Sequence, residues 1–292
     1  MSNLDFLIEK NISILSCPVC NTPLQKHPKS YNCKNGHNFD IAKQGYLNLL
    51  QSNKKRSTDP GDNRHMINAR RHFLEQGYYQ PISNLLNERL SSHISHFTND
   101  FPLQIVEVGS GDGYYINRLR ETNDYCHDGN CYGVDISKEA AKIAATKYQN
   151  ITFVVASAVE LPFINNSVDV LISLFSPFYE ESAKKVLAKP GIIIQAVPLT
   201  NHLLELRQVL YKEVNINHTA KNILTQAKYF KLEETKILNH SIHLSDQASI
   251  QDIFSMTPHY WRTSPERKRE LSLLQQLDVT LEIEFRIYTN EN

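Results

Sequence analysis

Residues 103–113 read Leu-Gln-Ile-Val-Glu-Val-Gly-Ser-Gly-Asp-Gly, and this stretch decides the fold class. Its apolar first half predicts a buried strand, and the Ile-Asn-Arg-Leu-Arg-Glu segment that follows predicts a helix. Gly109, Gly111 and Gly113 lie between them, where backbone without side chains can approach a nucleotide-like ligand. A dinucleotide-binding turn would continue with glycine or alanine. Tyr114 stands there instead, so the turn favours a different ligand.

More strands and helices alternate along the chain after this turn. Apolar strands are expected over 132–136, 152–157, 169–175 and 192–197. Helices are expected after the first of these, where Ser137 is the cap, and over 183–188. Strands without polar alternation are typical of a parallel sheet that is covered on both faces. The sequence therefore predicts a Rossmann-like α/β domain.

Helices and a strand are also expected on either side of this core. One helix begins near Asp62, and a second follows Pro81, because apolar residues recur there at helical spacing. Near the C-terminus a helix is expected over 247–255. The alternating pattern over 280–288 is typical of a strand in an edge hairpin.

Four residues near the N-terminus have the spacing of zinc ligands. Cys17 and Cys20 enclose two residues, and Cys33 and His37 enclose three. Two tight turns that each present two ligands can surround one tetrahedral ion, and Gly36 allows the backbone angle that such a turn often needs. Four protein ligands leave no position for water, so the zinc would be structural. The alternative is a small core in which these residues are unrelated.

Length and charge bound the organisation of the chain. Its 292 residues, 41% hydrophobic, suffice for one catalytic domain and a small accessory module. Basic and acidic residues both number 31, but residues 1–72 carry a balance of +6 and the remainder −6. This asymmetry indicates an N-terminal region that faces a polyanion, and a solvated face is the alternative.

Targeting signals and a disulfide framework are not expected. The first twenty residues have no signal-peptide pattern, and no apolar run approaches the roughly 18 residues of a membrane span. A cytoplasmic location is therefore expected. Cys126 and Cys131 are expected in a polar loop around residues 124–130, and both are interpreted as free thiols.

The glycine turn resembles the first motif of class I methyltransferases. In that family, an acidic residue followed by alternating glycines holds the amino-acid part of S-adenosylmethionine. The resemblance implies cofactor contacts from Glu107, Gly109, Gly111, Asp112 and Gly113.

Two later segments fit the same cofactor. Asp135 ends the next strand, where a carboxylate can accept both ribose hydroxyls. The alternative is an ordinary acidic residue at a strand end. Ser157 and Ala158 begin a segment that resembles the one lying along adenine, and Lys189-Pro190-Gly191 is also common in this family.

A combination of motifs resembles a narrower family, the bacterial 23S ribosomal RNA guanine-N1 methyltransferases (RlmA-like). These motifs are the zinc-ligand pattern, Lys43-x-Gly45-Tyr46-x-Asn48-Leu49-Leu50, Asp59-Pro60-Gly61-Asp62, Ala69-Arg70-Arg71-x-Phe73-Leu74, Gly77-x-Tyr79-Gln80-Pro81, His202-Leu203-x-Glu205-Leu206 and Met256-Thr257-Pro258-x-x-Trp261-Arg262. Together they cover nearly the whole chain. Two departures, Glu107 where relatives often have Asp and Ser110 where they often have Cys, keep the carboxylate and the glycines.

The resemblance implies an architecture and further contacts. A mostly parallel seven-stranded sheet would carry a small N-terminal zinc-binding module. We expect the zinc-binding, RNA-recognition module over 1–50, a linker and basic helix over 51–76, and the methyltransferase domain over 77–292. Tyr79 and His202 would be additional cofactor contacts, although packing and an ordinary polar role are their alternatives.

The implied reaction moves a methyl group from S-adenosylmethionine to N1 of a guanine in 23S ribosomal RNA. Guanine N1 carries a proton at neutral pH, so a general base would assist. Asp59, Asp62 and Glu205 are candidates, and nothing in their spacing selects one. Two other functions are weighed: a small-molecule, quinone-like methyltransferase, and a zinc-ribbon RNA-binding protein with an inactive methyltransferase fold.

The RNA partner suggests further residues. The target base would leave its stack and meet aromatic faces, for which Phe175, Phe178, Tyr260 and Trp261 are candidates, with a core role as the alternative. Phosphates would be contacted by basic residues of the N-terminal region, namely Lys54, Lys55, Arg56, Arg70 and Arg71. A homodimer is left open.

Overall fold

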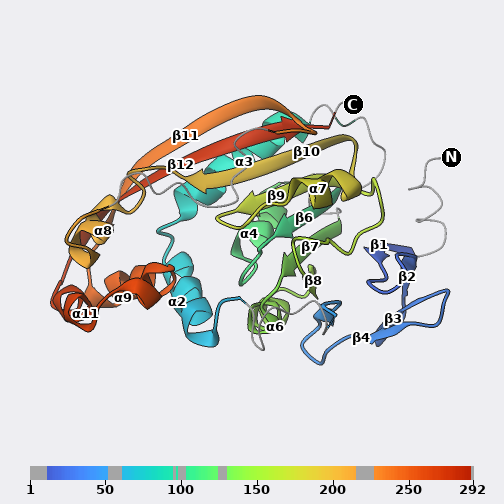
Figure 1. Cartoon of the computed structure of the whole chain (residues 1–292), viewed down its shortest axis with the longest axis horizontal. Helices are drawn as coiled ribbons and strands as arrows, with labels where there is room; N and C mark the ends of the chain where they lie inside the picture. Colours follow the sequence, from blue (N-terminus) through green and yellow to red (C-terminus); the bar gives the residue numbers. More distant parts are fainter. Residues whose placement is uncertain are drawn as a thin grey trace.

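The structure is a computed structural model of the whole chain, and it describes residues 12–51, 61–94, 97, 103–123, 130–214 and 227–290. A large sheet forms its centre, with strands in the order β11-β12-β10-β9-β6-β7-β8-β5 (Figure 1). The strands are β5 (Leu47–Asn48), β6 (Gln104–Val108), β7 (Asn130–Asp135), β8 (Thr152–Val155), β9 (Val168–Leu174), β10 (Leu187–Pro198), β11 (Lys231–Leu244) and β12 (Leu277–Thr289). All pairings are parallel except those of β12 with β10 and β11.

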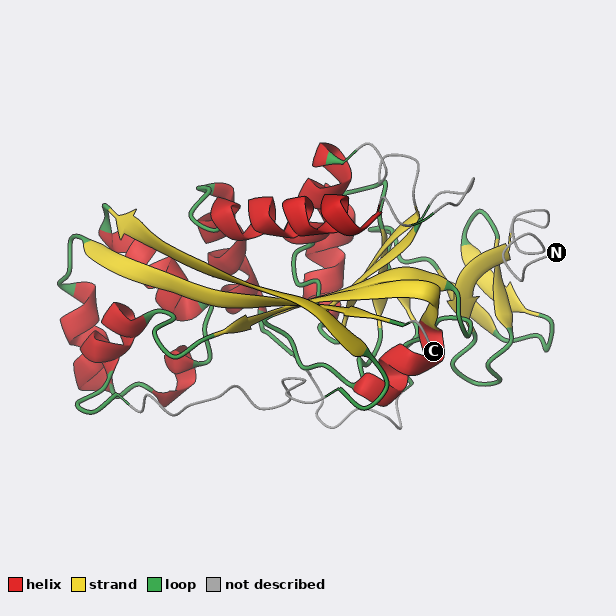
Figure 2. Cartoon of the chain, turned by 90° about the horizontal axis from the view of Figure 1, so that it is seen from above, coloured by secondary structure: helices red, strands yellow, loops and turns green. Residues whose placement is uncertain are grey.

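Helices cover both faces of this sheet, as Figure 2 shows in a view along its edge. They include α3 (Gln80–Ile94), α4 (Tyr114–Thr122), α6 (Lys138–Lys147) and α7 (Glu180–Val186). Every residue of β6 and β9 is buried, which matches their continuous apolar sequence. The predicted mostly parallel α/β sheet is confirmed, and so is the cap of α6, where the Ser137 hydroxyl oxygen accepts the Ala140 N–H.

The edges of the sheet differ from the prediction. The strand expected in an edge hairpin is β12, which lies between β10 and β11 and not at the edge. The edge strand is β11, whose largely exposed polar sequence carries little strand signal. At the other edge β5 adds a strand to the seven expected, because Leu47 and Asn48 pair with Val154 and Val155.

The segment before β10 also differs. The helix expected over 183–188 is α7, which ends at Val186, and residues from Leu187 onward are extended. Asn290 holds them in this form, since its Nδ2 donates to the carbonyls of Leu187 and Ala188 and its N–H donates to Gly191 O at 3.0 Å. These contacts come from a distant part of the chain, so local pattern could not reveal them.

A second group of helices lies at the carboxyl end of β10. It comprises α2 (Arg64–Glu75), α8 (Leu204–Leu210), α9 (Gln247–Ser255), α10 (His259–Arg262) and α11 (Pro265–Ser272). The predicted helices after Asp62 and Pro81 and over 247–255 are confirmed. In both overall views this helical group lies at the opposite end of the molecule from the N-terminal sheet (Figures 1 and 2).

The N-terminal region forms a separate four-stranded antiparallel sheet, β1 (Ile12–Ser16), β2 (Pro23–Lys26), β3 (Ser30–Cys33) and β4 (Asn38–Asp40). It is joined closely to the large sheet. The Ser16 N–H donates to Pro162 O at 2.9 Å, and the Ile164 N–H donates to Ile14 O at 2.8 Å. Leu15 and Leu24 share one buried apolar cluster with residues of β6, β7 and β8. The small sheet and one face of the large sheet therefore have a common core.

Cys131 lies in β7 and is a buried free thiol, so its expected place in a polar loop is wrong. Cys126 lies outside the described residues. In the described ranges, no helix has the length and apolar character needed to cross a membrane.

Candidate cofactor site and zinc centre

The four predicted zinc ligands converge at the end of the small sheet. Cys17 and Cys20 lie in the turn between β1 and β2, and Cys33 and His37 flank the turn between β3 and β4. Their ligand atoms all lie within 4.8 Å of one another. Gly36 has a φ of 84°, as expected for the second turn.

The distances between these ligand atoms suit a tetrahedral zinc ion. Cys20 Sγ lies 3.6 Å from Cys33 Sγ, and His37 Nδ1 lies 3.6 Å from Cys17 Sγ and 3.3 Å from Cys33 Sγ. Bonds of about 2.3 Å to sulfur and about 2.0 Å to nitrogen place tetrahedral ligands about 3.5–3.8 Å apart. Three thiols and one imidazole are a structural donor set that leaves no position for a substrate.

The glycine loop lies at the carboxyl end of β6 and is closed against β7. The N–H groups of Gly109 and Ser110 both donate to Val134 O, at 2.8 and 3.1 Å. Gly113 has a φ of 81°, and a Cβ there would lie 2.7 Å from Phe153 Cζ. Both the backbone angle and the space therefore exclude a larger residue at this position.

Glu107 is the penultimate residue of β6, just before the loop, and its carboxyl group is buried. Its Oε2 accepts the N–H of Ile116, in the first turn of α4, at 3.1 Å. Burial raises the pKa of Glu107 well above its usual value, the Ile116 N–H opposes this, and Asp112 and Asp135 raise it further. A positive charge of a ligand near Glu107 would therefore stabilise its ionised carboxylate form.

Asp135 ends β7 beside the loop and is partly exposed. Its Oδ2 accepts the Gly111 N–H at 2.9 Å, and its Oδ1 accepts the Ser137 N–H at 2.7 Å. Burial raises the pKa of this carboxyl group, and these two hydrogen bonds oppose the rise. Each carboxylate oxygen has a second acceptor direction. Asp135 can therefore hold the loop and still accept two ligand hydroxyls.

Asp112 is buried in the loop. Burial raises the pKa of its carboxyl group, and the positive charges of Arg70 and Lys147 oppose this rise. Arg70 of α2 pairs with Asp62 at 2.6 Å and donates from Nη2 to Met256 O at 3.2 Å. Its guanidinium is therefore engaged by two protein groups, and its predicted contact with an RNA phosphate stays a prediction. Local pattern could not reveal the contact with Met256, because it lies 186 residues away in the chain.

Ser157 and Ala158 follow β8 in a turn, where the Glu160 N–H donates to Ser157 O at 3.2 Å. Both are half-buried. They lie near Asp135 at the carboxyl ends of the strands, because β7 and β8 are parallel and adjacent. The first zinc-ligand turn borders this segment, since Pro18 and Ser157 line the same small cavity.

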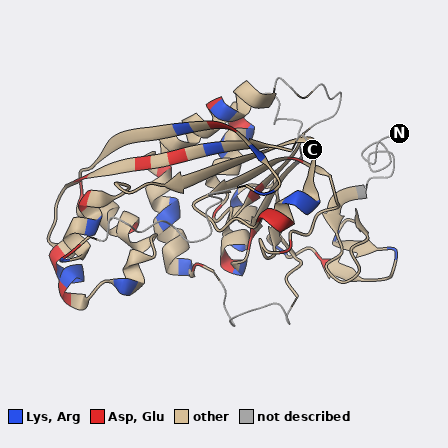
Figure 3. Ribbon diagram, turned by 45° about the horizontal axis from the view of Figure 1, so that its top comes forward, with Lys and Arg blue, Asp and Glu red and all other residues tan. Residues whose placement is uncertain are grey.

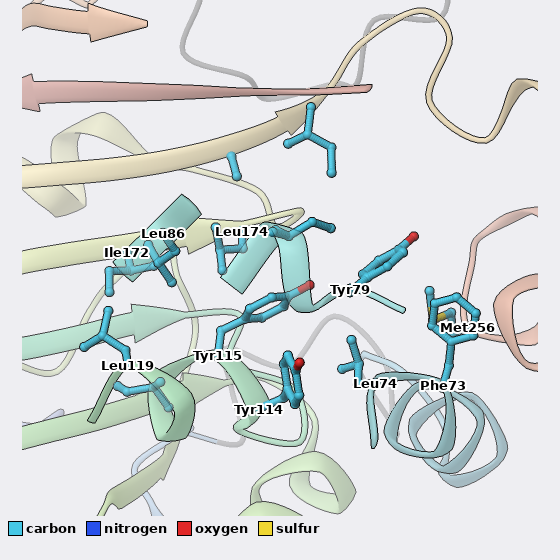
Figure 4. Close-up of a cluster of buried hydrophobic side chains, with 14 of the residues drawn as sticks. Phe73, Leu74, Tyr79, Leu86, Tyr114, Tyr115, Leu119, Ile172, Leu174 and Met256 are labelled. Carbon is cyan, nitrogen blue, oxygen red and sulfur yellow. The ribbon is translucent and has the colours of Figure 1, made fainter. Parts of the chain in front are cut away.

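Three rings form a row beside the glycine loop. Tyr79 lies 6.2 Å from Phe175, and Phe175 is stacked on His202 at 5.9 Å between ring centres. Figure 4 shows Tyr79 near Tyr115 and between the helix residue Phe73 and the strand residue Leu174. Tyr79 is buried, whereas Phe175 is 39% exposed. The two residues implied as extra cofactor contacts thus lie on either side of a partly exposed aromatic face.

Unpartnered polar atoms occur around the loop. Among the described residues, Ser110 Oγ, Tyr115 Oη and His202 Nδ1 are buried side-chain atoms without a hydrogen-bond partner. Burial lowers the pKa of His202 to about 3, with Arg207 and His259 acting in the same direction. Its imidazole is therefore neutral at pH 7. Buried donors and acceptors without partners are costly, so such a cluster fits a polar ligand. The sequence did not single out Tyr115.

The other sequence candidates are distributed as follows. Glu205 accepts the N–H and hydroxyl of Thr280 at 2.8 and 2.6 Å, which joins α8 to β12. Asp62 is paired with Arg70, and Asp59 lies outside the described residues. Phe178 is buried in the core. The general base stays unassigned.

The fold, the glycine loop and the cysteine–histidine cluster together define a class I methyltransferase that carries an N-terminal zinc ribbon. Comparison with known protein families supports this class for both parts of the chain. Residues 15–58 match the zinc-ribbon family described as RlmA, N-terminal, and residues 106–189 match the methyltransferase domain family. The cofactors that these two domains imply are S-adenosylmethionine and one structural zinc ion.

Similarity to individual proteins extends over nearly the whole chain. The chain is 28% identical to the 23S rRNA (guanine(748)-N(1))-methyltransferase of Streptomyces fradiae, covering 96% of this chain and 98% of that protein. It is 26% identical to a Bacillus subtilis protein provisionally named 23S rRNA (guanine-N(1)-)-methyltransferase, covering 95% and 97%. These findings confirm the resemblance to the 23S ribosomal RNA guanine-N1 methyltransferase family.

Proposed function

We propose that this enzyme transfers a methyl group from S-adenosylmethionine to N1 of a guanine in 23S ribosomal RNA. The observation that carries the proposal is the union of an RlmA-type zinc ribbon and a methyltransferase domain in one chain. Relatives with that activity in their names match 96% and 95% of this chain. A small acceptor molecule would give no reason for the ribbon.

The cofactor would be held at the carboxyl ends of β6, β7 and β8. Asp135 would accept the ribose hydroxyls, and Ser157 and Ala158 would border the adenine. Glu107 would face the ammonium group. The loop residues Gly109, Gly111, Asp112 and Gly113 and the side chains of Tyr79 and His202 would complete the contacts.

In this reaction the protein has two tasks, to position the substrates and to assist removal of the N1 proton. S-adenosylmethionine supplies a methyl group already activated by a sulfonium. The protein would hold guanine N1 in line with that group while the N1 proton leaves. The exposed face of Phe175, beside the proposed cofactor contacts, suits the stacking of an extruded guanine.

Basic side chains of the N-terminal region would position the RNA through its phosphates. The candidates are Lys54, Lys55 and Arg56, which lie outside the described residues, and the partly exposed Arg71, which pairs with Glu75 at 4.0 Å. RNA affinity should fall as salt rises, with a slope of roughly 0.7–0.9 per phosphate contact. Replacing Lys54, Lys55 and Arg56 together by alanine should flatten that slope and leave cofactor affinity unchanged. Equal slopes would remove this run from the interface.

The experiment for the reaction itself uses purified enzyme, isotopically labelled S-adenosylmethionine and unmodified 23S ribosomal RNA transcript. Nucleoside mass spectrometry after digestion separates N1-methylguanosine from its N2 and N7 isomers by retention time. We expect labelled N1-methylguanosine at one site. Label in another nucleoside would refute the assignment to guanine N1, and no label in RNA would favour a small-molecule acceptor.

A further inference from the structure

Tyr260, in the short helix α10, is the centre of a cluster at the surface of the helical group. Its ring centre lies 5.5 Å from that of His65 on α2, 5.4 Å from Phe254 on α9 and 5.0 Å from Trp261. The Lys268 ammonium of α11 lies 4.3 Å from the same ring centre, a cation–π distance. Four helices therefore meet at this tyrosine, which fixes the place of its neighbour Trp261.

Trp261 itself is turned toward solvent. Its side chain is 64% exposed, although it is the only tryptophan of the chain and a large apolar surface. Its one described ring contact is T-shaped, at an interplanar angle of 88° to Tyr260, so no described ring is stacked parallel on the indole. Tryptophan is enriched at interfaces, because it offers a large flat apolar surface to a partner.

The surroundings of Trp261 are basic. Residues 259–272 contain four Lys or Arg side chains and two acidic ones, and Glu270 is paired with Arg267. Arg262 and Arg269 are exposed, as is Arg64 at the start of α2. In Figure 3, Lys and Arg positions, coloured blue beside red acidic ones, lie on the helices at the end of the molecule remote from the zinc ribbon. Such charge favours a polyanion.

The cluster is linked to the cofactor site. Met256, between α9 and α10, accepts a hydrogen bond from Arg70, whose Nη1 lies 3.4 Å from the Cβ position of Gly111. On the other side, His259 Nδ1 lies 2.8 Å from the hydroxyl of Tyr211, the residue that directly follows α8. Trp261 thus projects from a helix that is anchored to both sides of the proposed active site.

We infer that Trp261 is a stacking platform for an unpaired RNA nucleotide close to the methylated guanine, with Lys268 and Arg262 beside it for the phosphates. The inference rests on the proposed function and extends it, because it places a second RNA contact at the end of the molecule opposite the ribbon. Aromatic stacking suits single-stranded RNA, since every base presents a flat face. Enzymes that extrude a base need contacts to its neighbours to hold the opened strand.

The test uses the holoenzyme and an RNA fragment around the guanine that the wild-type enzyme methylates in 23S transcript. Trp261→Ala should weaken binding about 5- to 150-fold, the range found for loss of one stacked base, without changing the slope of affinity against salt. Trp261→Phe should restore most of the affinity. Lys268→Ala should instead reduce the slope by roughly 0.7–0.9.

Matched controls lie on the edge strand β11. Ile237 is 55% exposed, and Lys236 is exposed next to it. Ile237→Ala and Lys236→Ala should bind RNA as the wild type does. All variants should keep wild-type affinity for S-adenosylmethionine and a cooperative unfolding transition well above the assay temperature.

Two outcomes would overturn the inference, and they are distinguishable. The first applies if the wild-type enzyme binds the RNA. Unchanged affinity in Trp261→Ala, or equal losses in the alanine and phenylalanine variants, would then show that this ring does not stack on RNA. Absence of RNA binding by the wild-type enzyme would contradict the proposed function and this inference together.

Discussion

Arg70 of α2 and Asp62 form an ion pair of 2.6 Å directly beside the glycine loop. The charges of Asp62 and Asp112 raise the pKa of Arg70 against the effect of its burial. Through Met256 O the same guanidinium reaches the end of α9. This side chain therefore helps to hold the helical group against the cofactor loop, together with contacts such as Glu205 to Thr280.

We predict that Arg70 and Asp62 are energetically coupled. Arg70→Ala removes the ion pair and the hydrogen bond to Met256 O, so the free energy of unfolding should fall by about 1–3 kcal/mol. Asp62→Asn alone should cost less. A double-mutant cycle followed by urea unfolding should give a coupling of at least about 0.5 kcal/mol. Strictly additive effects would mean that the pair contributes nothing to stability.

We predict one zinc ion per chain, held by the ribbon and needed for the stability of the whole molecule. Cys17→Ser and Cys33→Ser should lose the metal. They should melt roughly 5 °C or more below the wild type, because the ribbon shares its core with the large sheet. Elemental analysis and calorimetry measure both quantities. Cys131→Ser, outside the cluster, is the control that should keep its zinc; zinc-free wild-type protein would refute the site.

Asp135→Ala should weaken the binding of S-adenosylmethionine. Each lost hydrogen bond to a charged acceptor costs on the order of 1.5–3 kcal/mol, and the loop would also lose its contact at Gly111. Titration calorimetry measures the affinity, with Glu121→Ala at the exposed end of α4 as a control. Unchanged affinity in Asp135→Ala would show that the ribose is held by other residues.

Asp169 should make stability depend on pH. Burial raises its pKa to about 6, although Oδ2 accepts the Gln104 N–H at 2.8 Å. Because the unfolded carboxyl group has a pKa near 3.9, the folded state binds more protons between these values, and stability falls as pH rises through about 4 to 6. Across this window, the free energy of unfolding of the wild type should fall by up to about 3 kcal/mol relative to that of Asp169→Asn.

The measurement for Asp169 is urea unfolding of both proteins from pH 4 to pH 7.5. The difference in unfolding free energy should grow with pH and level off above about pH 7. A constant difference would show that Asp169 has an ordinary pKa in the folded protein.

Local pattern was enough for the parts of the fold in which sequence neighbours make the structure. The zinc ligands lie in two tight turns, and the strands around Glu107 and Asp135 are continuous apolar runs, so both could be predicted. The edge strand β11 was missed because its side chains are mostly exposed and polar. Hydrogen bonds to β12 hold this segment in a strand, although its composition does not predict one.

Contacts between remote segments explain what could not be predicted at the site. Arg70 looked like an RNA contact because it lies in a basic run, yet Asp62, Met256 and Gly111 surround it in space. Tyr115 gains interest only from its buried, unpartnered hydroxyl. Spacing along the chain carries neither kind of information.

The central claim is methylation of guanine N1 in 23S ribosomal RNA, and mass mapping of that RNA from cells with and without the gene tests it most directly. We predict one N1-methylguanosine that disappears on deletion, returns with the wild-type gene and does not return with the Asp135→Ala variant. An identical set of modified nucleotides in the deletion strain would contradict the claim.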